Sequence, residues 1–258
     1  SAFYECKKLQ NVTLSKNLQK LDGKVFQNDT KLTKIEIPKS LEENYWYYGG
    51  ETGISAGAFQ DCANLKTVTF EKGTTEIAEG LFAGCTGIEQ IKIPDTVTVI
   101  ESGAFGGCIN LKEIEIPDSV TEIGDSAFGY CSSLKTIKLS KKLGVMGYGT
   151  FYDCTSLTQV QLSNILTEIP SSAFYNCKKL TTINFPSTLT KIGSSAFYGC
   201  EALADITLGS KLKKIESQTF YGCTVLPSIV LPYNVTTIGD SAFVNCTKLT
   251  QITVPRNT

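Results

Sequence analysis

Ten cysteines are the first residues in this sequence whose type and spacing could support chemistry. Thiols can form disulfides, bind soft metal ions or stay reduced and buried. An even count would suit a disulfide framework. Most of these cysteines recur every 23 residues: Cys6, Cys62, Cys85, Cys108, Cys131, Cys154, Cys177, Cys200, Cys223 and Cys246.

Equal spacing argues against disulfides, because equivalent side chains in a stack of repeats point the same way. Repeats stack about 4.8 Å apart, whereas a disulfide needs Cβ atoms that face each other about 3.8 Å apart. The chain has no C-x-x-C pair for a zinc site. We therefore predict free, buried thiols, with disulfides and metal binding as alternatives. Asp29 occupies the cysteine slot of its own repeat and could bond nearby backbone N–H groups.

The chain has no histidine, which excludes Ser-His-Asp and Cys-His hydrolase sites. Two carboxylates could still hydrolyse a glycoside. Glu113 and Glu115 are the one close acidic pair at outward strand positions, with Lys92 and Lys138 in the flanking repeats. Four such charges on a flat sheet indicate ordinary surface charge. We therefore expect no enzyme activity and no cofactor.

An aromatic segment, "NYWYYGGETG", interrupts the pattern at residues 44–53. It contains Tyr45, Trp46, Tyr47 and Tyr48, followed by a Gly-Gly pair that could form a hairpin tip. Large aromatic side chains are common at binding sites, but they also fold back onto a scaffold. The segment could recognise a protein or a sugar, or it could be structural.

The elements that position these residues follow from an internal repeat. Phenylalanine recurs every 23 residues, and the single longer interval, 33 residues between Phe26 and Phe59, is one repeat plus ten residues. We predict one domain over residues 1–258, with about eleven repeats and an insertion at 43–53. The phenylalanines are Phe3, Phe26, Phe59, Phe82, Phe105, Phe128, Phe151, Phe174, Phe197, Phe220 and Phe243.

Each repeat predicts one short strand and one short helical turn. "LKEIEIP" alternates apolar and polar residues as a strand does, and its proline ends the strand. "GDSAFGYC" suggests a helical turn, with an N-cap residue three before Phe: Ser102, Asp125, Ser171, Ser194, Ser217 and Asp240. A unit this small cannot fold alone, so the repeats should stack into a solenoid.

The unit L-x-x-I-x-I/L with I-G-x-x-A-F-x-x-C resembles the BspA-like, or Treponema-type, leucine-rich repeat. The resemblance covers all the repeats and all ten cysteines; the insertion departs from it. It implies a right-handed leucine-rich-repeat superhelix. Its members are mostly bacterial surface or secreted proteins, with relatives in some protozoan parasites, and several bind host matrix proteins or other cells.

Outward strand positions predict a polar, mixed-charge face on the concave side. This face could bind a protein, or it could be a solvated sheet. The candidate contact residues on it are Gln90, Lys92, Glu113, Glu115, Lys138, Gln159 and Gln161. A second candidate strip is a stack of tyrosines on the turn side, which could pack together or form a contact: Tyr152, Tyr175, Tyr198 and Tyr221, with Tyr4 at the far end.

Net charge and hydropathy exclude some classes of partner and location. The formal charge is −1, with 24 basic and 25 acidic residues and no basic run, so nucleic acid is not an expected partner. No apolar run is long enough to span a membrane. The chain begins in mid-repeat, so we expect a mature or trimmed fragment with flanking sequence, or end-to-end association.

Three functions remain open. The first is a cell-surface or secreted binding or adhesion module that contacts other proteins, including host matrix proteins. The second is a carbohydrate-binding module that acts through the aromatic loop. The third is a spacer that holds another domain.

Overall fold

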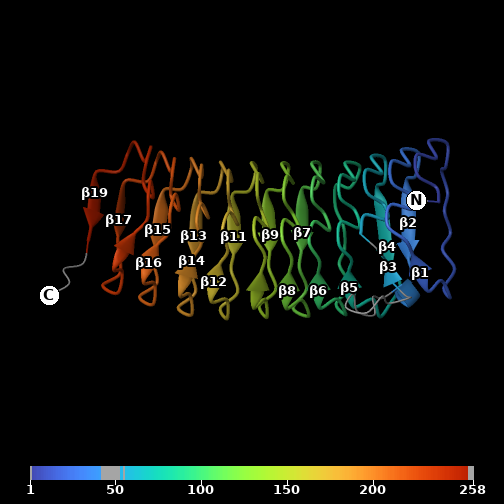
Figure 1. The fold of residues 1–258 in the computed structure, drawn as a ribbon, viewed down its shortest axis with the longest axis horizontal. Helices are drawn as coiled ribbons and strands as arrows, with labels where there is room; N and C mark the ends of the chain where they lie inside the picture. The colour runs from blue at the N-terminus through green and yellow to red at the C-terminus, as the bar shows by residue number, and fades with distance from the viewer. Residues whose placement is uncertain (1, 42–52, 55, 255–258) are drawn as a thin grey trace.

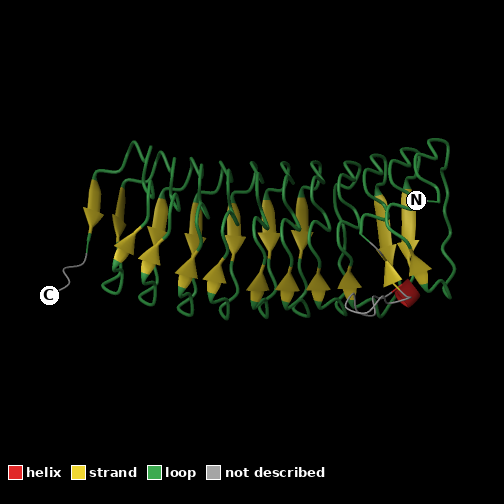
Figure 2. Cartoon of the chain, viewed as in Figure 1, coloured by secondary structure: helices red, strands yellow, loops and turns green. Residues whose placement is uncertain are grey.

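The computed structural model describes residues 2–41, 53–54 and 56–254. Tyr45, Trp46, Tyr47 and Tyr48 therefore lie outside the described residues. Successive repeats are stacked along the long axis in sequence order (Figure 1). The chain is a parallel β-solenoid, as the repeat predicted, and Figure 2 shows that short strands and loops make up nearly all of it.

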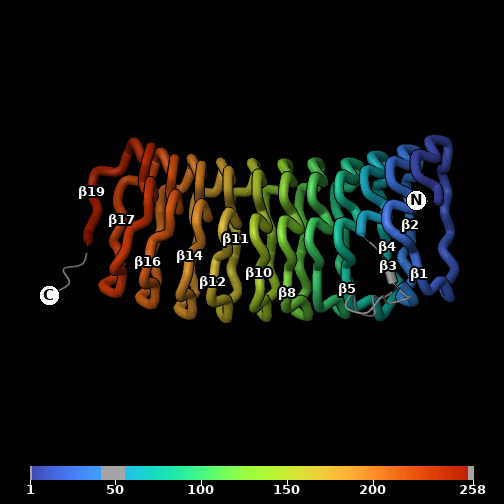
Figure 3. Tube along the Cα trace, viewed as in Figure 1, coloured from blue at the N-terminus to red at the C-terminus, as the bar shows by residue number. Residues whose placement is uncertain are grey.

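Most repeats contribute two strands, and these form two rows along the solenoid (Figure 1), whose stacked turns Figure 3 also shows as a tube. We call the first row the long-strand face. It contains β2 (Lys34–Ile37), β4 (Thr67–Phe70), β7 (Glu113–Glu115), β9 (Thr136–Lys138), β11 (Gln159–Gln161), β13 (Thr182–Asn184), β15 (Asp205–Thr207), β17 (Ser228–Val230) and β19 (Gln251–Thr253).

The second row consists of two-residue strands and was not predicted. It contains β1 (Lys20–Leu21), β3 (Gly53–Ile54), β5 (Glu76–Ile77), β6 (Val99–Ile100), β8 (Glu122–Ile123), β10 (Val145–Met146), β12 (Glu168–Ile169), β14 (Lys191–Ile192), β16 (Lys214–Ile215) and β18 (Thr237–Ile238). The single helix among the described residues is the 3-10 turn η1 (Lys39–Leu41).

Strands pair in parallel between neighbouring repeats, and equivalent positions face each other. Ile114 pairs with Ile137, and Val160 with Ile183. Because a one-residue slip would turn every core side chain outward, this exact-repeat register is fixed by the apolar pattern. The alternation seen in the sequence is thereby confirmed: β7, β9, β11, β13 and β15 each bury the middle residue and expose the two outer ones.

The predicted helical turn around each phenylalanine is wrong. Two residues per repeat, two before and two after Phe, have positive φ; around Phe128 they are Ser126 at 50° and Tyr130 at 62°. A helix cannot continue through left-handed residues. The N–H groups of Ser126, Phe128 and Tyr130 instead donate to carbonyl oxygens of the next repeat, over 2.7, 3.0 and 2.6 Å.

Two of the expected N-cap residues, Ser102 and Asp125, act between repeats. Ser102 Oγ accepts the backbone N–H of Asp125 (3.2 Å), and Asp125 Oδ1 accepts that of Tyr148 (2.6 Å). A helix cap would accept an N–H of its own first turn. These side chains therefore join repeats rather than start helices.

The core is a continuous stack of phenylalanine rings, which we call the Phe ladder. It runs from Phe3 to Phe243, and neighbouring rings such as Phe105 and Phe128 lie 5.5 Å apart at 10°. The eight rings from Phe59 to Phe220 are fully buried. Stacked aromatic pairs contribute about 0.5–1.5 kcal/mol beyond their buried area, so each repeat is stabilised by both neighbours.

The prediction of free thiols is confirmed for all ten cysteines. Nine are buried, and each Sγ donates to the carbonyl oxygen of the phenylalanine 26 residues earlier, or 36 across the insertion; for Cys131 and Phe105 the distance is 3.2 Å. Burial raises the pKa of Cys108 to about 12. These cysteines are structural, since a neutral thiol is a poor nucleophile and a poor metal ligand.

Asp29 replaces cysteine in this slot and is fully buried. Neither side-chain oxygen has a hydrogen-bond partner among the described residues, so the expected backbone hydrogen bonds do not form. Desolvation raises the pKa of the Asp29 carboxyl, and the nearby Cys6 backbone offsets only part of that increase.

Candidate functional site

The long-strand face presents two exposed side chains per repeat, in two rows that run along the solenoid. Its charges are concentrated at the N-terminal half, where Lys138 Nζ contacts Glu115 Oε1 at 2.5 Å and Lys112 Nζ contacts Glu89 Oε2 at 2.6 Å. From β11 to β13 the exposed residues are uncharged amides and hydroxyls: Gln159, Gln161, Thr182 and Asn184. A polar face of this kind can make many hydrogen bonds to another molecule.

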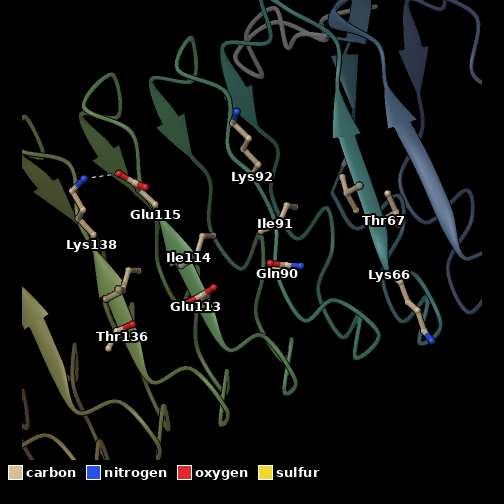
Figure 4. Close-up of a pocket in the computed structure, with 12 residues that line it drawn as sticks. Lys66, Thr67, Gln90, Ile91, Lys92, Glu113, Ile114, Glu115, Thr136 and Lys138 are labelled. Atoms are coloured by element: carbon tan, nitrogen blue, oxygen red, sulfur yellow. Dashed lines mark hydrogen bonds and ion pairs between the residues drawn. The ribbon is translucent and has the colours of Figure 1, made fainter.

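Five of the predicted site residues line one groove of about 630 Å³, which we call the β4–β7 groove. Figure 4 shows these residues on adjacent segments, with Lys66 and Thr67 on the opposite side. The predicted residues in it are Gln90, Lys92, Glu113, Glu115 and Lys138. Gln159 and Gln161 lie in the next groove along the face, of about 590 Å³, with Asn184 and Phe185.

The β4–β7 groove follows a break in the sheet. β4 pairs with β2 on one side, and no strand pairing joins its other edge to the next repeat within residues 56–254. Residues 90–93 form no strand; a single bridge, Gln90 to Glu113, joins them to β7. The sheet that continues from β7 to β15 therefore begins one repeat after β4.

Core packing is also looser beside this break. Val68 and Phe70 of β4 are half-buried, whereas the equivalent Ile35 and Ile37 of β2 are only 3% and 2% exposed. Val68 and Lys66 line the groove but were not among the predicted site residues. No signal in the sequence marks them, since "NLKTVTF" has the same pattern as the other repeats.

A second break, between β15 and β17, has a local chemical cause. Pro227 stands where other repeats supply a backbone N–H to the preceding repeat, and proline has none. Ile206, Leu208 and Ile229 beside it remain buried. Apolar side chains therefore stay buried at this second break. The break beside β4, in contrast, opens into a groove with half-buried apolar residues.

Some charged side chains in and beside the β4–β7 groove form ion pairs, and others do not. The hydrogen bond and the charge of Glu115 raise the pKa of Lys138. Outside the groove lining, Lys112 lowers the pKa of Glu89 in the same two ways. Lys92 and Glu113 have no ion-pair partner among the described residues, and Figure 4 shows one ion pair among the residues it draws. With Lys66, which also lines the groove, three charged side chains are therefore without an ion-pair partner in the described part of the chain.

The two glutamates at outward positions of β7 have different surroundings. Glu115 is held by Lys138, and Glu113 lies beside Gln90 and Thr136 on a sheet surface. Within the described part of the chain, no group of three or more His, Cys, Asp and Glu side chains is placed to hold a metal ion.

The tyrosine strip is a stack in which each ring covers the next. Centroids of Tyr152, Tyr175, Tyr198 and Tyr221 are 4.6, 4.5 and 4.4 Å apart, with interplanar angles of 3°, 7° and 1°. Ring faces are thus occupied by mutual packing, as one of the two interpretations predicted. The four tyrosines are half-buried, and Tyr221 Oη accepts a hydrogen bond from Asn245 Nδ2.

Described helices include none that is long and apolar enough to cross a bilayer. No curated protein matches the sequence. Among solved structures, a leucine-rich repeat protein from Bacteroides ovatus is 25% identical, with a TM-score of 0.70 over 97% of this chain and 74% of its own. The Treponema pallidum leucine-rich repeat protein is 25% identical, with a TM-score of 0.62 over 76% of this chain and 92% of its own.

A leucine-rich cell surface protein from Faecalibacterium prausnitzii shares the fold at 24% identity, with a TM-score of 0.51 over 91% of this chain and 82% of its own. The family model for the BspA type leucine-rich repeat region matches residues 1–48, 52–169 and 145–258. Together with the 23-residue register and the Phe ladder, this match shows that the chain belongs to the BspA-type leucine-rich-repeat family.

Proposed function

We propose that the chain is a non-catalytic binding module that contacts other proteins through its long-strand face. The observation that carries the proposal is the row of exposed polar side chains with the β4–β7 groove, in which Lys66, Lys92 and Glu113 have no ion-pair partner among the described residues. Family membership supports protein interaction as the general role. Within that role we propose adhesion to host matrix proteins or other cells.

We further propose that the protein works at the cell surface or after secretion. Support comes from the bacterial repeat family that the sequence resembles. The Faecalibacterium prausnitzii neighbour is described as a cell surface protein, but at this identity it supports the shared fold alone. Immunolabelling of intact and permeabilised cells that express the gene tests this location; signal after permeabilisation alone would contradict it.

The binding proposal is tested with the intact chain against a panel of purified extracellular-matrix proteins and a glycan array. A face variant, Thr136→Arg with Thr182→Arg, places two large charges on β9 and β13. A matched control, Val145→Arg with Thr237→Arg, adds the same two charges at exposed residues of β10 and β18 on the other row. We expect a matrix protein to bind wild type and control, and to lose at least tenfold affinity for the face variant.

A third variant covers the aromatic insertion: Trp46→Ala, Tyr47→Ala and Tyr48→Ala. Loss of binding in this variant alone, with an unchanged Tm, would assign recognition to the insertion instead of the face. Glycan binding without protein binding would replace the proposal with a carbohydrate-binding module. No binding to either panel would favour a spacer.

The absence of catalysis is likewise a proposal. It rests on the Lys138 contact to Glu115, because a paired carboxylate on an open sheet has none of the environment that raises the pKa of a general acid. Hydrolysis of any polysaccharide by wild type, lost in Glu113→Gln with Glu115→Gln, would contradict it.

A further inference from the structure

We propose that two copies of the chain associate side by side, in antiparallel orientation, through the surface of the second row of strands. This surface takes no part in the proposed function. In each repeat it covers the turn before the two-residue strand, the strand and the two residues after it, along the edge that carries β5, β6, β8 and β12 in Figure 1. We call it the second-row surface, and its segments are 72–79, 95–102, 118–125, 141–148, 164–171, 187–194 and 210–217.

Opposite charges are segregated along the second-row surface. Its first three segments contain seven acidic residues and one lysine, Lys72. The next four contain six lysines and two acidic residues, Glu168 and Glu216. The acidic residues of the first half are Glu76, Glu79, Asp95, Glu101, Asp118, Glu122 and Asp125, and the lysines of the second half are Lys141, Lys142, Lys191, Lys211, Lys213 and Lys214. A surface divided in this way is complementary to a reversed copy of itself.

Several lysines of the second half can contact another molecule. Lys142, Lys211 and Lys213 are exposed and have no ion pair among the described residues. Lys191 is bonded to Glu168 at 2.5 Å, but its side chain is still 55% exposed and can reach a second carboxylate. This half therefore presents positive charge that the chain itself does not neutralise.

An apolar patch lies where the two halves adjoin. Val145, Tyr148 and Ile165 are 52%, 52% and 53% exposed, and they belong to the adjacent segments 141–148 and 164–171. Among the described residues, no other large apolar side chain of the second-row surface is as exposed. Protein interfaces combine an apolar centre with a polar rim, and this surface has that arrangement.

A two-fold axis between β10 and β12 brings the two halves together. In an isologous dimer both copies use the same surface. With the solenoids antiparallel, each segment faces the segment at the same distance on the other side of the axis. The facing pairs are 141–148 with 164–171, 118–125 with 187–194, and 95–102 with 210–217.

Lysines meet carboxylates in all three pairs. Glu122 and Lys191 face each other directly, because both are exposed at the first position of β8 and β14. Val145 and Tyr148 lie over the segment of the second copy that carries Ile165, so the apolar patch is covered. The outermost segment, 72–79, faces residues 233–240, which contain Asp240 and no lysine. The contact therefore ends after six segments, about 24–29 Å along the solenoid at about 4.8 Å per repeat.

The charge pattern also selects the orientation. In a pair with parallel solenoids and a two-fold axis along them, each segment faces its own copy. Acidic segments would then meet acidic segments, and like charges placed together across an interface are costly. The antiparallel pair avoids this repulsion.

Sedimentation velocity of the intact chain over a concentration series tests the association. We expect a reversible dimer whose Kd rises at least tenfold when ionic strength increases from about 0.1 M to about 1 M, because the Debye length falls from about 10 Å to about 3 Å. Val145→Arg should also raise the Kd at least tenfold, since it places two charges in the apolar centre. Val230→Arg changes a valine that is 65% exposed on the long-strand face, so the Kd should change less than twofold.

Two charge exchanges test the orientation. Glu122→Lys and Lys191→Glu should each raise the dimer Kd at least tenfold when the variant is alone. A mixture of the two variants should form a heterodimer with a Kd close to that of wild type, because both of its contacts join a lysine to a glutamate. Lys34→Glu and Glu36→Lys, the same exchanges on exposed residues of β2, should change the Kd less than twofold.

A chain that stays monomeric at low ionic strength throughout the series would overturn the proposal. A dimer that does not respond to Val145→Arg, or two variants that fail to associate when mixed, would overturn it as well. The proposed function is tested separately: the affinity of Val145→Arg for a soluble matrix protein, measured per protomer, should stay within twofold of wild type. Failure of the matrix panel leaves the sedimentation result unchanged, because sedimentation uses the chain alone.

Discussion

The sulfur of Cys131 lies 3.2 Å from the carbonyl oxygen of Phe105 in the preceding repeat. The same carbonyl accepts the backbone N–H of Cys108 at 3.1 Å. One oxygen thus receives a donor from its own repeat and one from the next. The carbonyl oxygen of Phe105 therefore holds the turn within its own repeat and also bonds the buried thiol of the next repeat.

Replacing this thiol should destabilise the fold. Cys131→Ala removes the S–H donor and leaves a small cavity in a fully buried site, so we expect the free energy of unfolding to fall by about 1–2 kcal/mol. Urea denaturation measures the change. Cys6→Ala is the control because Cys6 is partly exposed, and an equal loss there would contradict a role for burial and bonding.

Thiol reactivity should divide the cysteines into two groups. In the native state, a thiol-reactive dye should label Cys6 rapidly and the nine buried cysteines slowly. Burial raises the pKa of buried thiols such as Cys131 and Cys177, which lowers the thiolate fraction that reacts. After denaturation without reductant, all ten should react. Fewer than ten would indicate disulfides.

A close approach between repeats should make glycines such as Gly193 costly to replace. A Cβ on Gly193 would lie 2.4 Å from the backbone nitrogen of Ser171, so Gly193→Ala should cost about 1–3 kcal/mol through displaced backbone. Gly144 has no atom within 4 Å of such a Cβ, so Gly144→Ala is the matched control. Thermal unfolding should show a lower Tm for the first variant alone.

Asp29 should make stability depend on pH. Its folded-state pKa is raised above 3.8, so the folded state binds more protons than the unfolded state between the two values. The free energy of unfolding must then fall as pH rises through this window. Asp29→Cys removes the titrating group and restores the common residue, and its stability relative to wild type should increase with pH over the same window. A pH-independent difference would contradict this assignment.

The repeat register, the strand and the buried thiols were predictable because each depends on apolar periodicity. The helical turn was wrongly predicted for a physical reason. The left-handed positions are filled by Ser126, Tyr130, Ser195 and Gln218 as well as by glycine, so residue type does not reveal them. Hydrogen bonds to the next repeat maintain that conformation, and a single repeat cannot show them.

The groove could be predicted only in part. Alternation identified Lys92 and Glu113 as outward-facing. The break beside β4 was not predictable, because residues 88–94 have the same pattern as residues 111–117, which form a paired strand. Pairing between repeats depends on how two backbones meet, and the alternation of a single repeat contains no information about that.

Around each phenylalanine, alternate backbone N–H groups donate to the following repeat, and this has a consequence for how such chains change length. A copied unit of 23 residues brings its own Phe, its own thiol or substitute and both left-handed residues in phase, so each new junction repeats the existing one. A gain of 22 or 24 residues on that side would put all of these out of phase at once. Whole units can therefore be added or lost while equivalent positions of neighbouring repeats stay aligned. The ten extra residues before Phe59 leave the phase of the ladder unchanged, since the rings of Phe26 and Phe59 still stack at 5.2 Å.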